Sequence, residues 1–362
     1  MTDDCSNLRD DQWLSSTGLQ FKNKRMILVT GATGLLGRVI ALELVKRGKK
    51  VRACKRPGSN LSDVRQSYHF YTPKADFYFN KIEWVDVDFN HQNSLYNSLK
   101  DVDEIYHCAA KISFDPKDGE QVLETGILMT RKLLSACMYM SIKKFLYVSS
   151  AAVLKVNKKK IELQIKNNNA SKNRYSAYVV SKYISEKMVW NAYKEGLDTV
   201  IINPGMIIGS GKWGEENDQM FNLFVKSKFT FPGGTSCVDV RDVAKTAVYL
   251  MENNIFGERF CISSENILYK DFATQIRKII GLGKPIVCPK KFMKLIKPAR
   301  KILGLVYGNA RYLTKENIEF ISDHQYYNGK KVKDLLQCKF YSVAESIQFH
   351  YGNYLSYKFG EK

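Results

Sequence analysis

Apolar residues in the first 204 positions fall into two alternating patterns. Short apolar runs suit buried parallel strands, and between them lie longer segments in which apolar residues recur every three or four positions, as in helices. The runs cover residues 26–29, 51–54, 81–87, 104–109, 144–150 and 199–204, and the helical segments cover residues 35–45, 120–140 and 178–193. Strands that alternate with such helices require right-handed crossovers, so the pattern predicts an α/β fold with a doubly wound parallel sheet.

The alternation ends near residue 205, where shorter elements and closely spaced glycines begin. We therefore expect residues 1–24 to form a flexible leader, residues 25–204 the sheet domain, and residues 205–362 mainly a smaller lobe with some segments that return to the sheet. The lysines at 158–160 and the asparagines at 167–169 are typical of a solvated loop.

Composition excludes several classes of protein. The 362 residues are 44% apolar, which is enough for a packed core, and no run approaches the roughly 18 apolar residues of a membrane-spanning helix. The first residues are polar and acidic rather than basic and then apolar, so we expect a cytoplasmic chain. The 8 cysteines are scattered without a CxxC pair, which favours reduced thiols and no bound metal.

The chain is strongly basic, with 56 Lys and Arg against 36 Asp and Glu and a net charge of +20. Such a charge attracts a dinucleotide, a nucleic acid or an anionic membrane surface. Because the basic residues are spread over the whole chain, the charge does not decide between these partners. Residues 290–307 mix apolar and basic positions around Pro298, which indicates either a surface helix on the smaller lobe or a segment that contacts anionic lipid.

Three glycines lie where the first predicted strand becomes the first predicted helix. In the sequence TGATGLLGR they are Gly31, Gly34 and Gly37. Glycine is needed there if the backbone must turn tightly, let a pyrophosphate approach, and pack the helix against the strand. The helix N-terminus then offers N–H groups and a positive dipole to the anion. Directly after an apolar strand, this turn predicts dinucleotide binding.

The GxxGxxG spacing resembles the extended branch of the short-chain dehydrogenase/reductase superfamily, in which the same turn opens the chain. The resemblance implies a Rossmann-type fold with a smaller C-terminal substrate lobe. It also implies that this turn binds a nicotinamide cofactor. The residues that it assigns to the contact are Gly31, Thr33, Gly34, Leu35, Leu36 and Gly37.

Later motifs extend the resemblance along the cofactor. The second strand ends in Lys55 and Arg56, where an NAD enzyme would hold an acid for the adenosine ribose. Two cations suit a 2′-phosphate, so NADP(H) is favoured over NAD(H). The other cofactor positions that the family implies are Asp88 and Phe89 at the adenine edge, Ala109 and Ala110 in a small-residue wall, Pro204 and Ile207 beside the nicotinamide, and Tyr178 and Lys182.

Tyr178 and Lys182 stand four residues apart, on one face of the predicted helix. A nearby ammonium favours the phenolate and lowers the pKa of the tyrosine, which lets it exchange a proton with a substrate oxygen during hydride transfer. Ser150 ends the fifth strand, and its hydroxyl can steady a developing alkoxide. The family pattern makes Ser150, Tyr178 and Lys182 the catalytic residues and leaves Ser149 to packing or to the cofactor.

The resemblance covers about residues 25–350, and residues 232–244 look like the subgroup related to dihydroflavonol 4-reductase and 3β-hydroxysteroid dehydrogenases. Within that segment, Asp239, Arg241 and Asp242 are expected to tie the smaller lobe to the sheet. Gly126 departs from the family, which usually has an asparagine credited with organising a proton-relay water. The departure puts the turnover rate in doubt more than cofactor binding.

The smaller lobe says less about the substrate. No cluster of arginines suits a nucleotide-sugar diphosphate, and residues 209–234 are rich in aromatic and Met side chains that could wall an apolar pocket or form a core stripe. These side chains are Trp213, Met220, Phe221, Phe224, Phe229 and Phe231. We therefore expect an uncharged, partly apolar substrate.

The leading hypothesis is an NADP-dependent oxidoreductase that interconverts a carbonyl and a secondary alcohol on a small molecule. One alternative is a nucleotide-sugar epimerase or dehydratase on the same frame. Another is a dinucleotide-sensing or RNA-binding protein with weakened catalysis, suggested by the net charge of +20 and by Gly126. The leading hypothesis needs no metal and no nucleic acid, and it leaves a homodimer and peripheral contact with an anionic membrane open.

Overall fold

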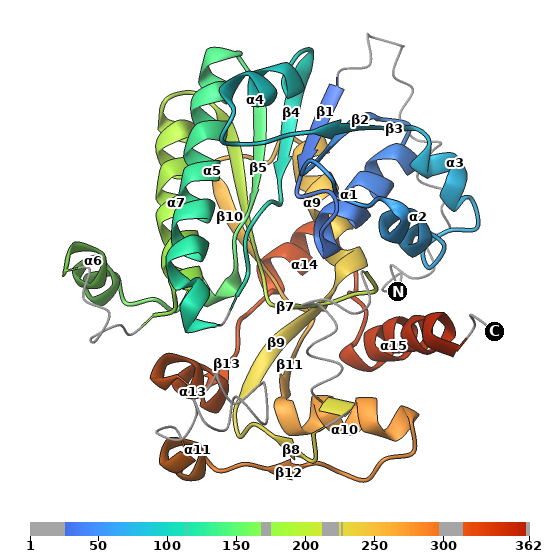
Figure 1. Ribbon diagram of the computed structural model, residues 1–362, viewed down its shortest axis with the longest axis vertical. Coiled ribbons are helices and arrows are strands. Elements are labelled where there is room, and N and C mark those ends of the chain that lie inside the picture. Colours follow the sequence, from blue (N-terminus) through green and yellow to red (C-terminus); the bar gives the residue numbers. More distant parts are fainter. Residues whose placement is uncertain are drawn as a thin grey trace.

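The computed structural model describes residues 26–113, 115–167, 175–211, 224–225, 227–296 and 314–359. The prediction of a leader at residues 1–24 lies outside them. A seven-stranded sheet with the order β10-β6-β5-β4-β1-β2-β3 forms the larger part of the molecule (Figure 1). Its strands are β1 (Met26–Thr30), β2 (Lys50–Lys55), β3 (Ile82–Asp86), β4 (Val102–His107), β5 (Lys144–Val148), β6 (Asp198–Pro204) and β10 (Glu258–Ile262). Every neighbouring pair is parallel, which confirms the predicted Rossmann-type sheet.

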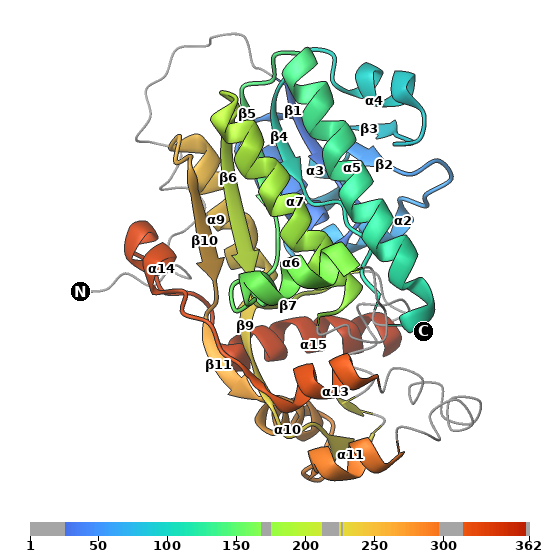
Figure 2. The same ribbon diagram turned by 90° about the vertical axis from the view of Figure 1, so that its left-hand side faces the viewer.

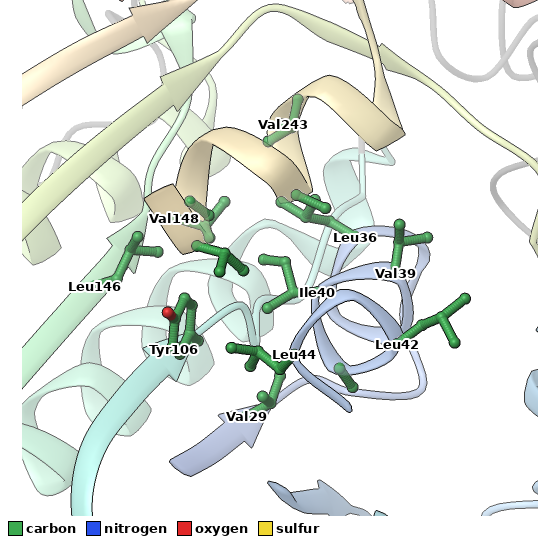
Figure 3. Close-up of a cluster of buried hydrophobic side chains, with 14 of the residues drawn as sticks. Val29, Leu36, Val39, Ile40, Leu42, Leu44, Tyr106, Leu146, Val148 and Val243 are labelled. Atoms are coloured by element: carbon green, nitrogen blue, oxygen red, sulfur yellow. The ribbon is translucent and has the colours of Figure 1, made fainter. Parts of the chain in front are cut away.

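Helices cover both faces of this sheet (Figures 1 and 2). On one face, α1 (Leu35–Lys46) and α9 (Val240–Glu252) enclose the larger core, in which side chains such as Val29, Ile40 and Val243 point toward one another (Figure 3). On the other face, α5 (Gly119–Tyr139) and α7 (Ala177–Lys194) pack on a second core. Successive strand residues point to opposite faces, so Leu28 fills the second core and Val29 the first, and the strand therefore reads as a continuous apolar run.

Four shorter helices lie in the connections between strands of this sheet: α2 (Ser62–Tyr68), α3 (Ala75–Phe79), α4 (Gln92–Ser98) and α6 (Lys158–Asn167). The last of these corrects the prediction of a solvated loop at residues 158–160. Ile161 is fully buried against Val179 and Val180 of α7, and Glu162 accepts hydrogen bonds from Tyr183 and Lys187. The lysine run is therefore the exposed first turn of a helix anchored by one apolar residue, while residues 168–169 lie outside the described part of the chain.

The smaller lobe contains a second sheet of β11 (Glu265–Leu268), β9 (Gly234–Asp239) and β13 (His324–Gln325), with β7 (Met206–Ile208) also paired to β9. A separate ladder joins β8 (Phe229–Thr230) to β12 (Ile286–Val287). The helices of this lobe are α10 (Tyr269–Ile279), α11 (Lys290–Ile296), α13 (Lys315–Ser322), α14 (Lys330–Leu336) and α15 (Val343–Phe359) (Figure 2). No helix in the described ranges is long and apolar enough to cross a membrane.

The aromatic side chains near β8 divide between core and surface. Phe224 is buried against the rings of Tyr269 and Phe272, and Phe231 packs edge-on to Phe224, so these two belong to the core of the lobe rather than to a pocket wall. Phe229 is exposed. Trp213, Met220 and Phe221 lie outside the described residues.

A buried polar network joins the two parts of the chain. Asp239 begins α9 and accepts hydrogen bonds from the guanidinium of Arg241 and from Nε2 of His350 in α15. The Nδ1 atom of His350 lies 2.7 Å from the Ser210 hydroxyl, and Asp242 accepts from the Tyr341 amide. The structure therefore agrees with the expectation that the acidic and basic residues at 239–242 tie the lobes together.

Candidate functional site

The glycine turn lies where the strand order reverses, between neighbouring strands β1 and β4. Gly31 adopts the left-handed conformation, with φ of +65°, and a Cβ at this position would lie 2.7 Å from the Ala109 backbone. The amide of Ala109 also reaches the hydroxyl of Thr30 at 3.4 Å. Glycine is therefore required at position 31, because a side chain there would meet the backbone that follows β4 and push the two strand ends apart.

The N-terminus of α1 is open to a ligand. Gly34 begins this helix, is exposed, and has no side chain to cap the free N–H groups of the first turn. A Cβ at Gly37 would lie 2.2 Å from the Gly31 carbonyl oxygen, so the helix packs directly on the turn. The turn therefore fits a pyrophosphate, with unblocked N–H groups and no side chain in the way.

The other residues predicted to contact the cofactor at this turn differ in their burial and in their contacts. Thr33 is half-buried, and its carbonyl accepts a hydrogen bond from the Arg38 guanidinium. Leu35 packs against the segment after β7. Its Cδ1 atom comes so near Gly209 that a Cβ at that glycine would lie only 2.9 Å away. Leu36 is buried in the core beside α1, so only its backbone can face a ligand.

The cations after β2 are not equivalent. Lys55 stands beside Asp86 in the register of β2 and β3, and its ammonium forms an ion pair with that carboxylate. Arg56 is exposed, and within the described ranges no hydrogen bond or ion pair engages its guanidinium. The contact of both cations with a 2′-phosphate stays a prediction, and Lys55 already has a carboxylate partner from the neighbouring strand. Arg56 is the cation left to meet a phosphate.

The residues predicted at the adenine edge follow β3. The Asp88 carboxylate accepts a hydrogen bond from the Asn90 amide and lies 3.5 Å from His91 Nε2, so it shapes its own turn. Phe89 is half-buried against the second core, and its carbonyl accepts from Lys132. Both residues are at the carboxyl end of a strand, as expected, with the Asp88 carboxylate already used by local contacts.

The predicted wall and nicotinamide segments lie at the carboxyl ends of β4 and β6. Ala109 is half-buried and Ala110 exposed, directly after β4. Pro204 is buried at the end of β6, and Ile207 is half-buried in β7. Between the last two, a Cβ at Gly205 would lie 2.5 Å from the Ser236 carbonyl oxygen, which explains why this chain has glycine there.

The three predicted catalytic residues come together at the end of β5. Ser150 follows the strand, and its hydroxyl is near enough to Tyr178, in the first turn of α7, to lower the pKa of the phenol. Lys182 is one turn further along that helix, and its ammonium donates to the Val148 carbonyl at 2.6 Å. The neighbouring Ser149 is buried, and its hydroxyl has no partner among the described residues. The structure thus groups the hydroxyl, the phenol and the ammonium at one sheet edge.

The pKa of Tyr178 differs from the expectation that a nearby ammonium lowers it. Burial raises the pKa of Tyr178, and the hydrogen bond from Ser150 offsets part of that increase. Burial also lowers the pKa of Lys182 to about 8, while Cys108 and Glu186 act in the opposite direction. A lowered pKa for Tyr178 is therefore not found in this structure. The ammonium is held by the Val148 carbonyl and lies 4.9 Å from the Tyr147 ring centre, and burial dominates at the phenol.

The close packing of two helices explains why glycine stands at position 126. It lies in α5 where this helix crosses α7, and a Cβ would lie 2.2 Å from the Ser181 hydroxyl oxygen. Its carbonyl accepts hydrogen bonds from Thr130 and Ser185. An asparagine at this position would need the two helices to separate or Ser181 to turn away, so the departure from the family is matched by the close crossing of the helices.

Sequence reasoning missed a buried histidine beneath the site. His107 ends β4, and its ring nitrogens lie 2.7 Å from the Thr30 hydroxyl and 3.2 Å from the Thr130 hydroxyl. Burial, aided by the charge of Lys182, lowers the pKa of His107 to about 3. His107 and its two hydroxyl partners are distant in sequence, so no spacing could have indicated the contact. The only signal in the sequence is a polar histidine inside an otherwise apolar strand end.

We expect His107 to make stability fall in mild acid. The unfolded chain binds a proton at the ordinary pKa of 6.5, whereas the folded chain binds it only near 3. The contribution of neutral His107 is therefore complete above the first value and is lost as the pH falls toward the second, by about 2 kcal/mol between pH ~7 and ~5. His107→Asn should flatten this part of the profile in urea unfolding at the two pH values.

The matched control is His69→Asn, because His69 is exposed beside Asp76. It should keep the wild-type dependence on pH. If His107→Asn retains the full acid-induced loss of stability, the histidine is not held neutral in the folded chain.

The described residues contain no group of three or more His, Cys, Asp or Glu side chains that could hold a metal ion. The cysteines given by the structure are free thiols, and burial raises the pKa of Cys54 and Cys137. The site is therefore made of hydroxyl, phenol, amine and backbone groups around a dinucleotide cradle.

The family model for the "NAD dependent epimerase/dehydratase family" matches residues 27–262. The chain is 24% identical to a putative dihydroflavonol 4-reductase of Synechocystis, over 88% of this chain and 91% of the relative. It is also 24% identical to cinnamoyl-CoA reductase CAD2 of Medicago truncatula, over 84% of this chain and 97% of the relative. UDP-glucose 4-epimerase of Thermotoga maritima has the same fold, with a TM-score of 0.69, 15% identity, and coverage of 92% and 99%.

The match to the family model shows that this chain belongs to the NAD-dependent epimerase/dehydratase family. It is an NAD(P)-dependent reductase or epimerase of extended short-chain dehydrogenase/reductase type.

Proposed function

We propose that the protein is an NADP-dependent oxidoreductase that interconverts a carbonyl and a secondary alcohol on a small, partly apolar substrate. The observation that carries the proposal is the grouping of Ser150, Tyr178 and Lys182 at the same sheet edge as the open glycine turn. A substrate oxygen placed between the two hydroxyl groups would receive a hydrogen bond from each.

The proposed roles follow from these positions. When bound, the dinucleotide supplies or accepts the hydride. Tyr178 donates a proton to the substrate oxygen in reduction and takes it back in oxidation. Ser150 donates a hydrogen bond to that oxygen as negative charge grows on it. Lys182, held at the Val148 carbonyl, is placed to bind the ribose hydroxyls and to keep the site positive. Gly31, Gly34 and Gly37 would hold the diphosphate, and Pro204 and Ile207 would line the nicotinamide end.

The preference for NADP rests on Arg56. Its exposed guanidinium follows β2, where the adenosine ribose of a dinucleotide would lie, while Lys55 is paired with Asp86. A guanidinium binds a phosphate through charge-assisted hydrogen bonds, and a NAD ribose offers it only hydroxyls. We therefore assign the 2′-phosphate contact to Arg56 and a supporting role to Lys55.

Arg56→Ala should weaken NADPH binding by about 10- to 100-fold and leave NADH binding within about threefold, because a charge-assisted hydrogen bond contributes about 1.5–3 kcal/mol. Fluorescence titration with both reduced dinucleotides measures the two affinities. Lys159→Ala, an exposed cation on α6, is the matched control and should change neither. Equal losses for NADPH and NADH would show that Arg56 does not read the phosphate.

The described arginines favour a reductase over a nucleotide-sugar epimerase. Between residues 227 and 359 each arginine that the structure describes is already engaged. Arg241 pairs with Asp239, Arg259 pairs with Glu186, and Arg277 is buried with bonds to backbone carbonyls that include those of Gly283 and Ser227. A sugar diphosphate would need such groups free, whereas an uncharged ketone would not. The named reductase relatives support the same choice.

A substrate screen tests the proposal. NADPH oxidation is followed by absorbance across a panel of aromatic and alicyclic ketones and aldehydes, beside conversion of UDP-glucose by an epimerase assay. Turnover of a ketone with no nucleotide-sugar conversion supports the proposal. Nucleotide-sugar conversion without net NADPH consumption would establish the epimerase alternative. Tight dinucleotide binding with no turnover of either class would favour a sensing role.

A further inference from the structure

One end of the smaller lobe combines exposed apolar side chains with unpaired lysines. We call it the basic apolar surface, and it lies on and next to β8, β12 and α11, on the end of α10 and on the segment between α10 and β12, at the end of the molecule opposite the seven-stranded sheet (Figures 1 and 2). Its apolar members are Phe229, Leu282, Ile286, Phe292 and Leu295, and its lysines are Lys228, Lys278, Lys284 and Lys291.

The apolar side chains are exposed because of how these elements pair. Phe229 and Ile286 are register partners in the β8–β12 ladder, so they stand on one face, and they are 58% and 60% exposed. Phe292 and Leu295 lie three residues apart on α11 and are 52% and 75% exposed, while Met293 between them is buried. The helix therefore rests on the lobe through one side and presents apolar groups on the other.

The charge of this surface is left uncompensated. Glu319 of α13 and Asp323 directly after that helix are the acids that contact α11, and they are already paired with Lys290 and Lys294. Within the described ranges, no hydrogen bond or ion pair engages the side chains of the four lysines of the basic apolar surface. Exposed apolar side chains together with unpaired lysines at one end of a molecule are what a surface needs to enter the headgroup region of an anionic bilayer.

We propose that the basic apolar surface docks the protein reversibly on an anionic membrane. A second copy of the chain is a poor occupant, because the contact would bring the same lysines together on a chain with a net charge of +20. A nucleic acid would use the lysines but has no use for protruding aliphatic groups. Docking here turns the smaller lobe toward lipid and leaves the cofactor edge of the sheet in water. The inference does not rest on the proposed reaction.

Vesicle co-sedimentation of the full chain tests this docking. The vesicles are phosphatidylcholine alone or with about 30% phosphatidylserine, in about 0.1 M salt. We expect at least tenfold tighter binding to the anionic vesicles, with a steep loss at about 0.5 M salt. Each lysine near an anionic surface raises partitioning roughly fivefold. The variant Lys284→Glu, Lys291→Glu, Leu295→Ser should therefore lose more than tenfold.

The matched control carries the same charge change on α6, as Lys159→Glu, Lys160→Glu, Leu163→Ser, in which all three positions are exposed. It should stay within about threefold of the wild type, since its charges lie away from the contact. Unchanged circular dichroism and an unchanged thermal unfolding midpoint show that both variants are folded. Equal losses in the two variants, no preference for anionic vesicles, or an effect seen only as altered self-association in sedimentation velocity would each overturn the proposal.

Discussion

Tyr178→Phe should lower kcat for ketone reduction by about 10²- to 10⁴-fold, the range that a positioned general acid contributes. The phenol is buried next to Ser150, and its raised pKa keeps it protonated at neutral pH in the cofactor-free chain. It is therefore ready to donate, and phenylalanine keeps the ring while removing the proton. NADPH affinity should change by less than about threefold, because the ring still fills the site. Stopped-flow turnover and fluorescence titration separate the two effects.

Tyr183→Phe is the control for this change. Tyr183 lies on the same helix, and its hydroxyl donates to Glu162 at 2.9 Å on the side that faces α6. Losing that bond should leave kcat within about twofold, since the hydroxyl is remote from the reacting oxygen. If Tyr178→Phe keeps more than about a tenth of wild-type turnover, Tyr178 is not the proton donor.

Gly31→Ala should destabilise the chain by about 2–5 kcal/mol and weaken dinucleotide binding by more than tenfold. Two separate costs combine at this position. A side chain in the left-handed conformation costs about 1–2 kcal/mol, and overpacking against atoms that cannot move adds about 1–3 kcal/mol. The obstructing atoms are the Ala109 backbone, 2.7 Å from the new Cβ. Urea unfolding and NADPH titration measure the two losses.

Gly48→Ala separates these costs. Gly48 follows α1 with φ of +71°, and no atom lies within 4 Å of its ideal Cβ. This control should lose only the conformational part, about 1 kcal/mol, with NADPH affinity intact. Equal destabilisation in both variants would mean that the contact between the turn and Ala109 does not limit the substitution.

The sheet could be predicted because its strands are buried on both faces. Residues 26–29 and 199–204 are apolar whichever face is considered, so a short unbroken run is a sufficient signal. The predicted ends of two strands lie beyond the observed ends. The predicted strands at 104–109 and 144–150 end at His107 and Val148, which leaves Ala109 and Ser150 in loops. The division into two domains near residue 205 stays a prediction. The strand β10 pairs with β6 and so returns to the sheet from beyond that residue.

Within the candidate site, local motifs could be predicted and long-range pairings could not. The glycine turn and the spacing of Tyr178 and Lys182 lie within single elements, where sequence distance sets geometry. The pairing of Lys55 with Asp86 depends on the register of β2 against β3, which sequence does not display. The α6 helix was missed because only Ile161 of this lysine-rich segment is fully buried, while Leu163 is exposed and Ile165 only partly buried.

The seventh strand has a consequence during synthesis on the ribosome. Glu258–Ile262 pairs with β6, so until residue 262 has emerged the growing polypeptide carries β6 with one side unpaired. An exposed, apolar, parallel edge invites association with neighbouring chains. Translation must thus pass some 58 residues beyond Pro204, from 204 to 262, before the nascent sheet is protected. During that interval the unpaired side of β6 is where the nascent molecule is most open to aggregation.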